Sequence, residues 1–348
     1  MYVRSLVLAA AVLSAAHFSQ PASAQTVGYA DAIDQLGTSC GPDIAKFCKN
    51  ESLGGGRVRE CLQRNQGSVS PRCIASISAL TSLLEKRAAA RVSVMKVCDV
   101  DIKRRCSGDG NLLECFFKTK ENVSTPCRQA VADAGFDVGL ASPSTTNAPI
   151  KLTPGELVNS LQGVEAPATR ISAAQLRQLA AQSLADPARK ERVNRAPLFA
   201  QLDQLAQFTI AVQFDFNSAR IRPDSFRAVG LMADALYSPY LQGYKFLIVG
   251  HTDAKGTREY NLKLSQQRAD AIRDALINPF GIPASRIEAV GLGEEQLLNS
   301  AKPDAAENRR VQLINSANNP ITPSKKNGAQ AGAAFKIGFD QLSCCGTD

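Results

Sequence analysis

Hydrophobic and polar positions follow two clear periods in the C-terminal part of the chain. Residues 208–214 alternate between apolar and polar or small side chains, as in a strand with one buried face. Later segments repeat apolar residues with the 3.6-residue period of a helix. The order strand, helix, strand, helix, strand, strand predicts an α+β fold, an α/β sandwich with helices on one side of one sheet. The predicted strands span 208–214, 245–249, 286–290 and 310–315, and the predicted helices span 223–236 and 258–276.

The remaining segments are less regular. Residues 1–24 combine Arg4, an apolar run over 6–16 and a small-residue cleavage site ending at Ala24, which predicts a secretory signal peptide. No later stretch is apolar enough to span a bilayer, so we expect no transmembrane segment in the mature chain. Residues 141–206 are predicted to be a linker with helical segments, and residues 317–348 a flexible basic tail.

Eight of the ten cysteines form an internal repeat within residues 25–140. The first unit, at about 38–75, and the second, at about 96–130, space their cysteines alike except in the middle step. That step holds a Gly-rich stretch in both units, as expected of a loop between two helices. Each unit opens with the pattern Cys-x-x-Asp, at Cys40 to Asp43 and at Cys98 to Asp101. We therefore interpret each unit as a helical hairpin.

Disulfides are expected because an exported protein meets an oxidising compartment. Antiparallel helices would pair the outer cysteines with each other and the inner cysteines likewise, although four cysteines allow three pairings. The region has no C-x-x-C pair and no histidine, which argues against zinc and thiol redox chemistry. The spacing resembles the cysteine-rich repeat of the Golgi cysteine-rich glycoprotein, which implies disulfide-bonded helices. The predicted bridges are Cys40–Cys73, Cys48–Cys61, Cys98–Cys127 and Cys106–Cys115.

The net charge of the chain is +8. Between Cys40 and Cys127, 15 Lys and Arg residues face 9 Asp and Glu residues, so the positive charge is concentrated in the cysteine-rich part. It could attract an envelope protein or an anionic envelope surface. A merely solvated basic surface is the alternative reading, and no nucleic-acid partner is expected. Cys344 and Cys345 have no assigned role.

A charged cluster surrounds the junction between the second predicted strand and its helix. Asp253 follows the strand, and its carboxylate is favoured by the helix N-terminus. Asn261 and Arg268 are seven residues apart and so share one face of that helix. A ligand with one ammonium and one carboxylate could lie between Asp253 and Arg268, because both contacts would be charge-assisted.

Several short motifs in this region resemble the OmpA-like peptidoglycan-binding domain over about 207–316. They include Gly250-His-Thr-Asp253, Tyr260-Asn261, Arg268-Ala269 and Asn308-Arg-Arg-Val311. The resemblance implies non-covalent binding of the peptidoglycan stem peptide through diaminopimelate. Asp253 would take its ammonium and Arg268 its carboxylate, with Asn261, Asn217 and Arg309 as supporting contacts.

Catalysis is not expected from this sequence. Once the signal peptide is removed, His251 is the only histidine, and the resemblance places it in a binding motif. No cofactor or metal is predicted. The sequence therefore predicts a periplasmic, cell-wall-associated protein that tethers a cysteine-rich module to peptidoglycan. A peptidoglycan-remodelling hydrolase and a flagellar-stator-like anchor are the alternatives.

Overall fold

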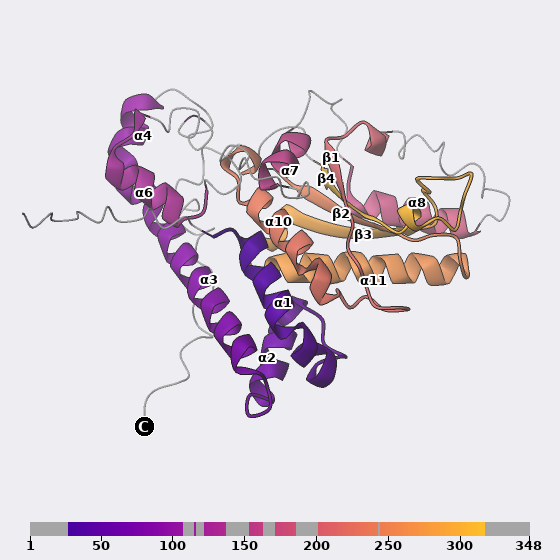
Figure 1. Ribbon diagram of the computed structural model, residues 1–348. Coiled ribbons are helices and arrows are strands. Elements are labelled where there is room, and N and C mark those ends of the chain that lie inside the picture. The colour runs from indigo at the N-terminus through magenta and orange to yellow at the C-terminus, as the bar shows by residue number, and fades with distance from the viewer. Residues whose placement is uncertain are drawn as a thin grey trace, which may run out of the picture.

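Figure 1 shows a computed structural model that describes residues 27–106, 115, 122–136, 153–162, 171–185, 201–242 and 244–316. The predicted signal peptide, the predicted basic tail, Cys344 and Cys345 lie outside the described residues, as do parts of the predicted linker. Across the described ranges, every helix is too short or too polar to cross a bilayer.

One four-stranded sheet has the order β1-β4-β2-β3. The strands β2 (Phe246–His251) and β3 (Ile287–Gly293) are parallel, whereas β4 (Val311–Asn315) is antiparallel to both β2 and β1 (Gln207–Ile210). Every residue of β2 and β4 is buried. The first strand is shorter than predicted. Ile210 pairs with Val311, where β4 begins, so no partner strand remains for the alternating residues beyond it.

Two helices cover one face of this sheet, which confirms the α/β sandwich. They are α10 (Phe226–Leu236), preceded by the short helix η5 (Pro223–Ser225), and α11 (Arg258–Ile277). Gly291 allows α11 to lie directly on β3, because a Cβ atom there would be 2.1 Å from the backbone nitrogen of Gln266. This close approach places the polar edge of α11 above the end of β2.

The prediction of helices on one side only is wrong. Helix α8 (Ala173–Ala185) covers the other face of the sheet, where Leu176 and Ala180 share a core with Leu247 and Val290. The sequence predicted helical segments within 141–206 but did not show which surface they cover. The capped helix α7 (Pro154–Leu161) packs against α10 and β1. Both helices come from the stretch predicted as a linker.

The first cysteine-rich unit contains three helices rather than a simple hairpin. Helix α1 (Tyr29–Phe47) is followed by a Gly-rich turn, η1 (Gly54–Gly56), by α2 (Arg57–Arg64) and by the long helix α3 (Pro71–Val97). One disulfide joins α1 to α3 through Cys40 and Cys73, and a second joins Cys48 to Cys61 of α2. The middle step therefore holds its own helix, which the Gly-rich composition concealed.

The second unit begins where α3 ends and lies at the far end of that helix from α2 (Figure 1). Its described helices are α4 (Asp99–Arg105) and α6 (Thr125–Asp133), and its disulfides are Cys98–Cys127 and Cys106–Cys115. All four disulfides thus have the predicted pairing. The second unit has a core of its own, formed around its cysteines, Val94 and Val131.

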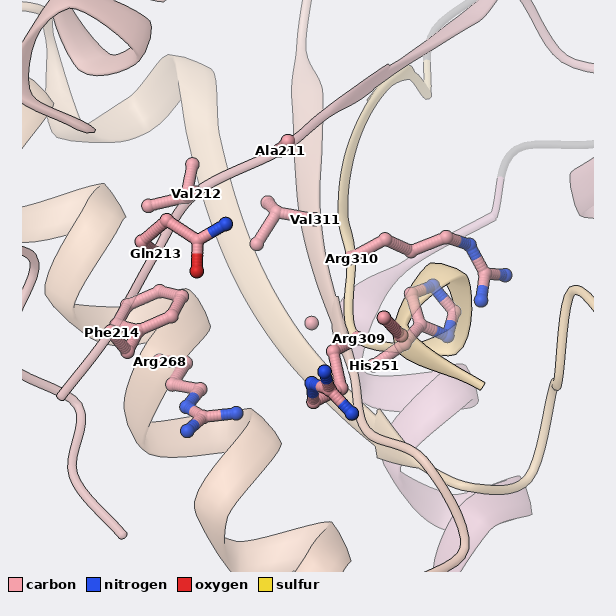
Figure 2. Close-up of a pocket in the computed structure, with 11 residues that line it drawn as sticks. Ala211, Val212, Gln213, Phe214, His251, Arg268, Arg309, Arg310 and Val311 are labelled. Carbon is pink, nitrogen blue, oxygen red and sulfur yellow. The ribbon is translucent and has the colours of Figure 1, made fainter. Parts of the chain in front are cut away.

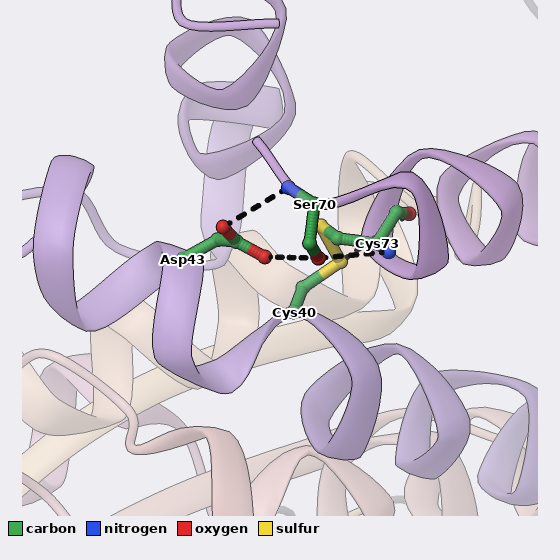
Figure 3. The surroundings of a disulfide bond; sticks show 4 residues. All are labelled: Cys40, Asp43, Ser70 and Cys73. Carbon is green, nitrogen blue, oxygen red and sulfur yellow. Dashed lines mark hydrogen bonds between the residues drawn. A yellow bond between two sulfur atoms is a disulfide. The ribbon is translucent and has the colours of Figure 1, made fainter. Parts of the chain in front are cut away.

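The repeated Cys-x-x-Asp pattern has one structural role in both units. In the first, Asp43 accepts hydrogen bonds from the backbone amide and the hydroxyl of Ser70, at 3.2 and 2.7 Å, beside the Cys40–Cys73 bridge (Figure 3). In the second, Asp101 accepts the same pair of bonds from Ser124. Each serine precedes the first residue of the next helix. The aspartate therefore fixes the start of the helix that carries the partner cysteine.

The first cysteine-rich unit is docked on the sandwich and shares its main hydrophobic core. Asp234, buried within α10, accepts hydrogen bonds from the first two amides of α1, at Tyr29 and Ala30, both at 2.9 Å. Its carboxylate also forms a buried ion pair with Arg87 of α3, at 3.4 Å. Gly230 lets the two helices meet, since a Cβ atom there would lie 2.6 Å from the Cα of Ala30. The unit and the sandwich therefore form one packed body.

Candidate functional site

A cavity of about 120 Å³ opens beside the end of β2 (Figure 2). Its wall comes from the segment after β1, from β2, from α11 and from the start of β4. The residues that line it are Ala211, Val212, Gln213, Phe214, Gly250, His251, Arg268, Ala306, Arg309, Arg310 and Val311. Two of these, Arg268 and Arg309, belong to the predicted site, whereas Asp253 is not part of the cavity wall.

Asp253 lies in the loop between β2 and α11 and is 7% exposed. Its Oδ1 accepts a hydrogen bond from the amide of Lys255 at 3.2 Å, a local turn that fixes the carboxylate. Its Oδ2 is 2.5 Å from Nη1 of Arg309. Thr257 then caps α11 by accepting a bond from the amide of Tyr260. The loop thus holds an oriented carboxylate, and one of its oxygens pairs with Arg309, whose side chain is 46% exposed.

Arg268 is a half-buried cation on α11. Its Nε donates to the carbonyl oxygen of Ser218 at 3.0 Å, and its guanidinium carbon lies 4.9 Å from the centre of the Phe214 ring. Burial, helped by the nearby charge of Arg309, lowers the pKa of Arg268, while Tyr260 and Asp253 act in the opposite direction. In the described residues no hydrogen bond engages its two terminal nitrogens. They remain available for a carboxylate.

The two asparagines of the predicted site lie outside the cavity wall. Asn261 is buried, and its side-chain amide donates to the carbonyl oxygen of Asp253 at 3.2 Å and to Glu294 at 2.6 Å. It therefore positions the Asp253 loop. Asn217 is exposed in the turn after Phe214, with a left-handed φ of 55°. The same turn supplies the Ser218 carbonyl that orients Arg268.

Other residues that support the site had no predicted role. Asn308 is fully buried, and its side-chain amide donates to three backbone carbonyls between 299 and 303, at 3.0–3.2 Å. It fixes the backbone next to Arg309. At the start of α11, Arg258 donates two hydrogen bonds to Glu295, at 2.6 and 2.9 Å. The hydroxyl of Ser183 in α8 is hydrogen-bonded to both of these side chains. The Asn-Arg-Arg motif was a signal for Asn308, whereas the pairing with Ser183 left none in the sequence.

His251 is a buried, neutral side chain at the base of the cavity. Burial and then the positive charge of Arg310 lower its pKa well below 6.5, and an interaction with Gln312 opposes this only in part. A ring held neutral inside the core adds no charge to the cavity. The described residues contain no group of His, Cys, Asp and Glu side chains arranged to hold a metal ion.

Acidification is expected to destabilise the protein through His251. The imidazole takes up a proton near pH 6.5 in the unfolded chain but not in the folded protein. The free energy of unfolding therefore falls by about 1.4 kcal/mol for each pH unit below that value. Urea unfolding between pH 7.5 and 5 would measure this slope. The His251→Asn variant should show a flatter profile in the same window. An identical slope in both proteins would contradict the assignment.

Comparisons with known proteins agree with the two resemblances seen in the motifs. Residues 213–310 match the model of the OmpA family, and residues 31–69 match that of the cysteine-rich repeat. Outer membrane porin F of Pseudomonas aeruginosa is 34% identical over 111 residues, covering 31% of each chain. The peptidoglycan-associated lipoprotein of Brucella melitensis biotype 1 is 39% identical over 107 residues, which is 30% of this chain and 62% of that protein.

Among solved structures, the peptidoglycan-associated lipoprotein of Burkholderia pseudomallei is 37% identical, with a TM-score of 0.26. The match covers 30% of this chain and 86% of that one. This chain spans less than two thirds of the length of the two curated relatives named above. The C-terminal part is thus an OmpA family domain, joined here to a cysteine-rich repeat region.

Proposed function

We propose that this protein binds peptidoglycan non-covalently through the diaminopimelate of the stem peptide. Asp253 receives the ammonium of the diaminopimelate head group, and Arg268 receives its carboxylate. The observation that carries the proposal is a fixed, buried carboxylate close to an arginine whose terminal nitrogens are unengaged at a cavity. Asn261 and Asn217 act as supporting residues from the loops that orient these two side chains.

The relatives support this ligand. The OmpA family model matches residues 213–310, which include both charged residues, and the similar proteins include peptidoglycan-associated lipoproteins. The cavity also suits binding better than catalysis, because its histidine is buried with a depressed pKa and the nearby Asp253 carboxylate is held in an ion pair with Arg309. We therefore propose no enzymatic activity. Incubation with purified sacculi should release no soluble muropeptides, and their release would favour the hydrolase alternative.

In this proposal the protein resides in the periplasm, associated with the cell wall. Because the first cysteine-rich unit shares a core with the sandwich, wall binding would fix that unit in place. The second unit, at the far end of α3, would then be held away from the attachment point (Figure 1). It is the part best placed to meet an envelope protein or an anionic envelope surface.

The Asp253→Ala, Arg268→Ala double variant is expected to lose sacculus binding. Each charge-assisted contact contributes about 1.5–3 kcal/mol, so the two together should account for at least a hundredfold in affinity. Co-sedimentation with purified sacculi measures this loss. The matched control is Arg222→Ala, Asp224→Ala, which removes the same residue types from a pair that is 52% exposed on both sides. Equal binding by both double variants would overturn the site.

A further inference from the structure

Arg309 has a different relation to the ligand from that of Arg268. We propose that Arg309 occupies Asp253 in the free protein, is displaced from it by the ligand's ammonium, and then binds a second carboxylate of the ligand. The inference rests on the proposed function and narrows its ligand class. The segment recognised would carry one free ammonium and two free carboxylates, rather than the amino-acid head group alone.

The contact between Arg309 and Asp253 is one that a ligand cation can replace. The Asp253 side chain is 10% exposed and is tied to its own loop through Lys255, whereas the Arg309 side chain is 46% exposed. When a second cation approaches Asp253, the arginine is therefore the partner that can leave. Its backbone does not need to move, because Asn308 holds the adjacent turn through three carbonyl groups.

Among the charged side chains that are placed to touch a ligand, one positive charge is in excess. Arg268 and Arg309 are cations, Asp253 is the facing anion, and burial keeps His251 neutral. Arg310 lines the cavity but extends away from it, and its terminal nitrogens donate to the carbonyl oxygen of Gln296. A head group with one ammonium and one carboxylate would leave the excess in place. A ligand with one more carboxylate would neutralise it.

The position of Arg309 favours the same conclusion. Figure 2 shows the guanidinium groups of Arg268 and Arg309 at the same end of the cavity. The two are close enough that Arg309 lowers the pKa of Arg268. The two neighbouring cations repel each other in the free protein, and a ligand with two carboxylates would relieve that repulsion. Arginine is also suited to gripping a carboxylate with two parallel hydrogen bonds.

Two synthetic probes would separate this role from a purely structural one. Both are N-acetylated tetrapeptides of sequence L-Ala-γ-D-Glu-meso-diaminopimelate-D-Ala with a C-terminal carboxamide. In the first probe the α-carboxylate of D-Glu is free, and in the second it is amidated. The ammonium and carboxylate at the end of the diaminopimelate side chain are free in both. Calorimetric titration of the whole protein should give about tenfold or greater preference for the first probe, the effect of one charge-assisted contact.

The Arg309→Gln variant is expected to abolish this preference. It should bind the amidated probe at least as tightly as the wild type, because Asp253 no longer has a competing internal partner. The Arg222→Gln variant removes an exposed arginine of the same domain and should keep the preference. Thermal unfolding of each variant would check that the fold is retained.

The outcomes are distinct. Equal affinity of the wild-type protein for the two probes would overturn the inference while leaving the proposed function intact. An equal loss of both affinities in Arg309→Gln would assign Arg309 a structural role alone and also overturn it. Failure of the wild-type protein to bind either probe would remove the proposed function itself.

Discussion

The Asp234→Ala variant is expected to lose about 3–5 kcal/mol of folding free energy, the cost of breaking a buried ion pair by removing one partner. The substitution leaves Arg87, which is 1% exposed, as an uncompensated cation. It also removes the acceptor for the amides of Tyr29 and Ala30 at the start of α1. Because α1 packs directly on α10, the loss should appear in the unfolding of the sandwich as well as in the cysteine-rich unit. Chemical denaturation followed by circular dichroism would measure it.

The matched control for this experiment is Asp31→Ala. Asp31 lies in the first turn of the same helix and pairs with Arg227 of α10, but its side chain is 63% exposed. An exposed ion pair of this kind contributes about 0–1 kcal/mol. If the two variants were destabilised equally, the buried carboxylate would not be the anchor of the interface.

The elements of the sandwich were predictable because their periodicity is local. The second helix was placed at 258–276 and is found at Arg258–Ile277, since Thr257 caps it and its apolar face repeats without interruption. The end of β1 was not predictable, because it depends on where β4 begins, a hundred residues later. Alternation continues beyond Ile210, but a strand without a neighbour has no ladder to join.

The candidate site was predictable only in part, for the same reason. Asp253 and Arg268 lie on consecutive elements, so their spacing already indicated a shared edge. The contact between Asp253 and Arg309 joins residues 56 apart and exists because β4 lies next to β2 in the sheet. A motif could name Arg309 as a supporting residue, but only the sheet order shows that it covers Asp253 in the free protein.

The relation between the two halves was the least visible in the sequence. Spacing predicted the disulfides, and the resemblances treated the cysteine-rich region and the sandwich as separate modules. The interface depends on Asp234, a single acid in an apolar helix, and on Gly230 one turn earlier. Neither residue is unusual in a helix, so the sequence showed no sign of the interface. Only the packed structure shows that Asp234 and Gly230 both face α1. The first unit therefore shares one packed body with the sandwich, which changes what loss of its disulfides should do.

Removing the Cys40–Cys73 disulfide is expected to destabilise the sandwich itself. The bridge closes a separation of 33 residues, which corresponds to about 3–4 kcal/mol in the chain-entropy model. Both cysteines belong to the core that also contains Phe246 and Ile272 of the sandwich. In the Cys40→Ala, Cys73→Ala variant, amides of β2 and α11 should therefore exchange with solvent faster than in the wild-type protein. Hydrogen exchange read by mass spectrometry would locate the change.

The Cys98–Cys127 disulfide provides a closely matched comparison. Its separation of 29 residues gives nearly the same entropic contribution, but its cysteines lie in the separate core of the second unit. Faster exchange in the Cys98→Ala, Cys127→Ala variant should then be confined to the end of α3, α4 and α6. Similar loss of protection in β2 from both variants would mean that the second unit is equally part of the cooperative body. A loss from neither would mean that the sandwich folds independently of the first unit. Either result would contradict the assignment of the first unit to the core of the sandwich and of the second unit to a core of its own.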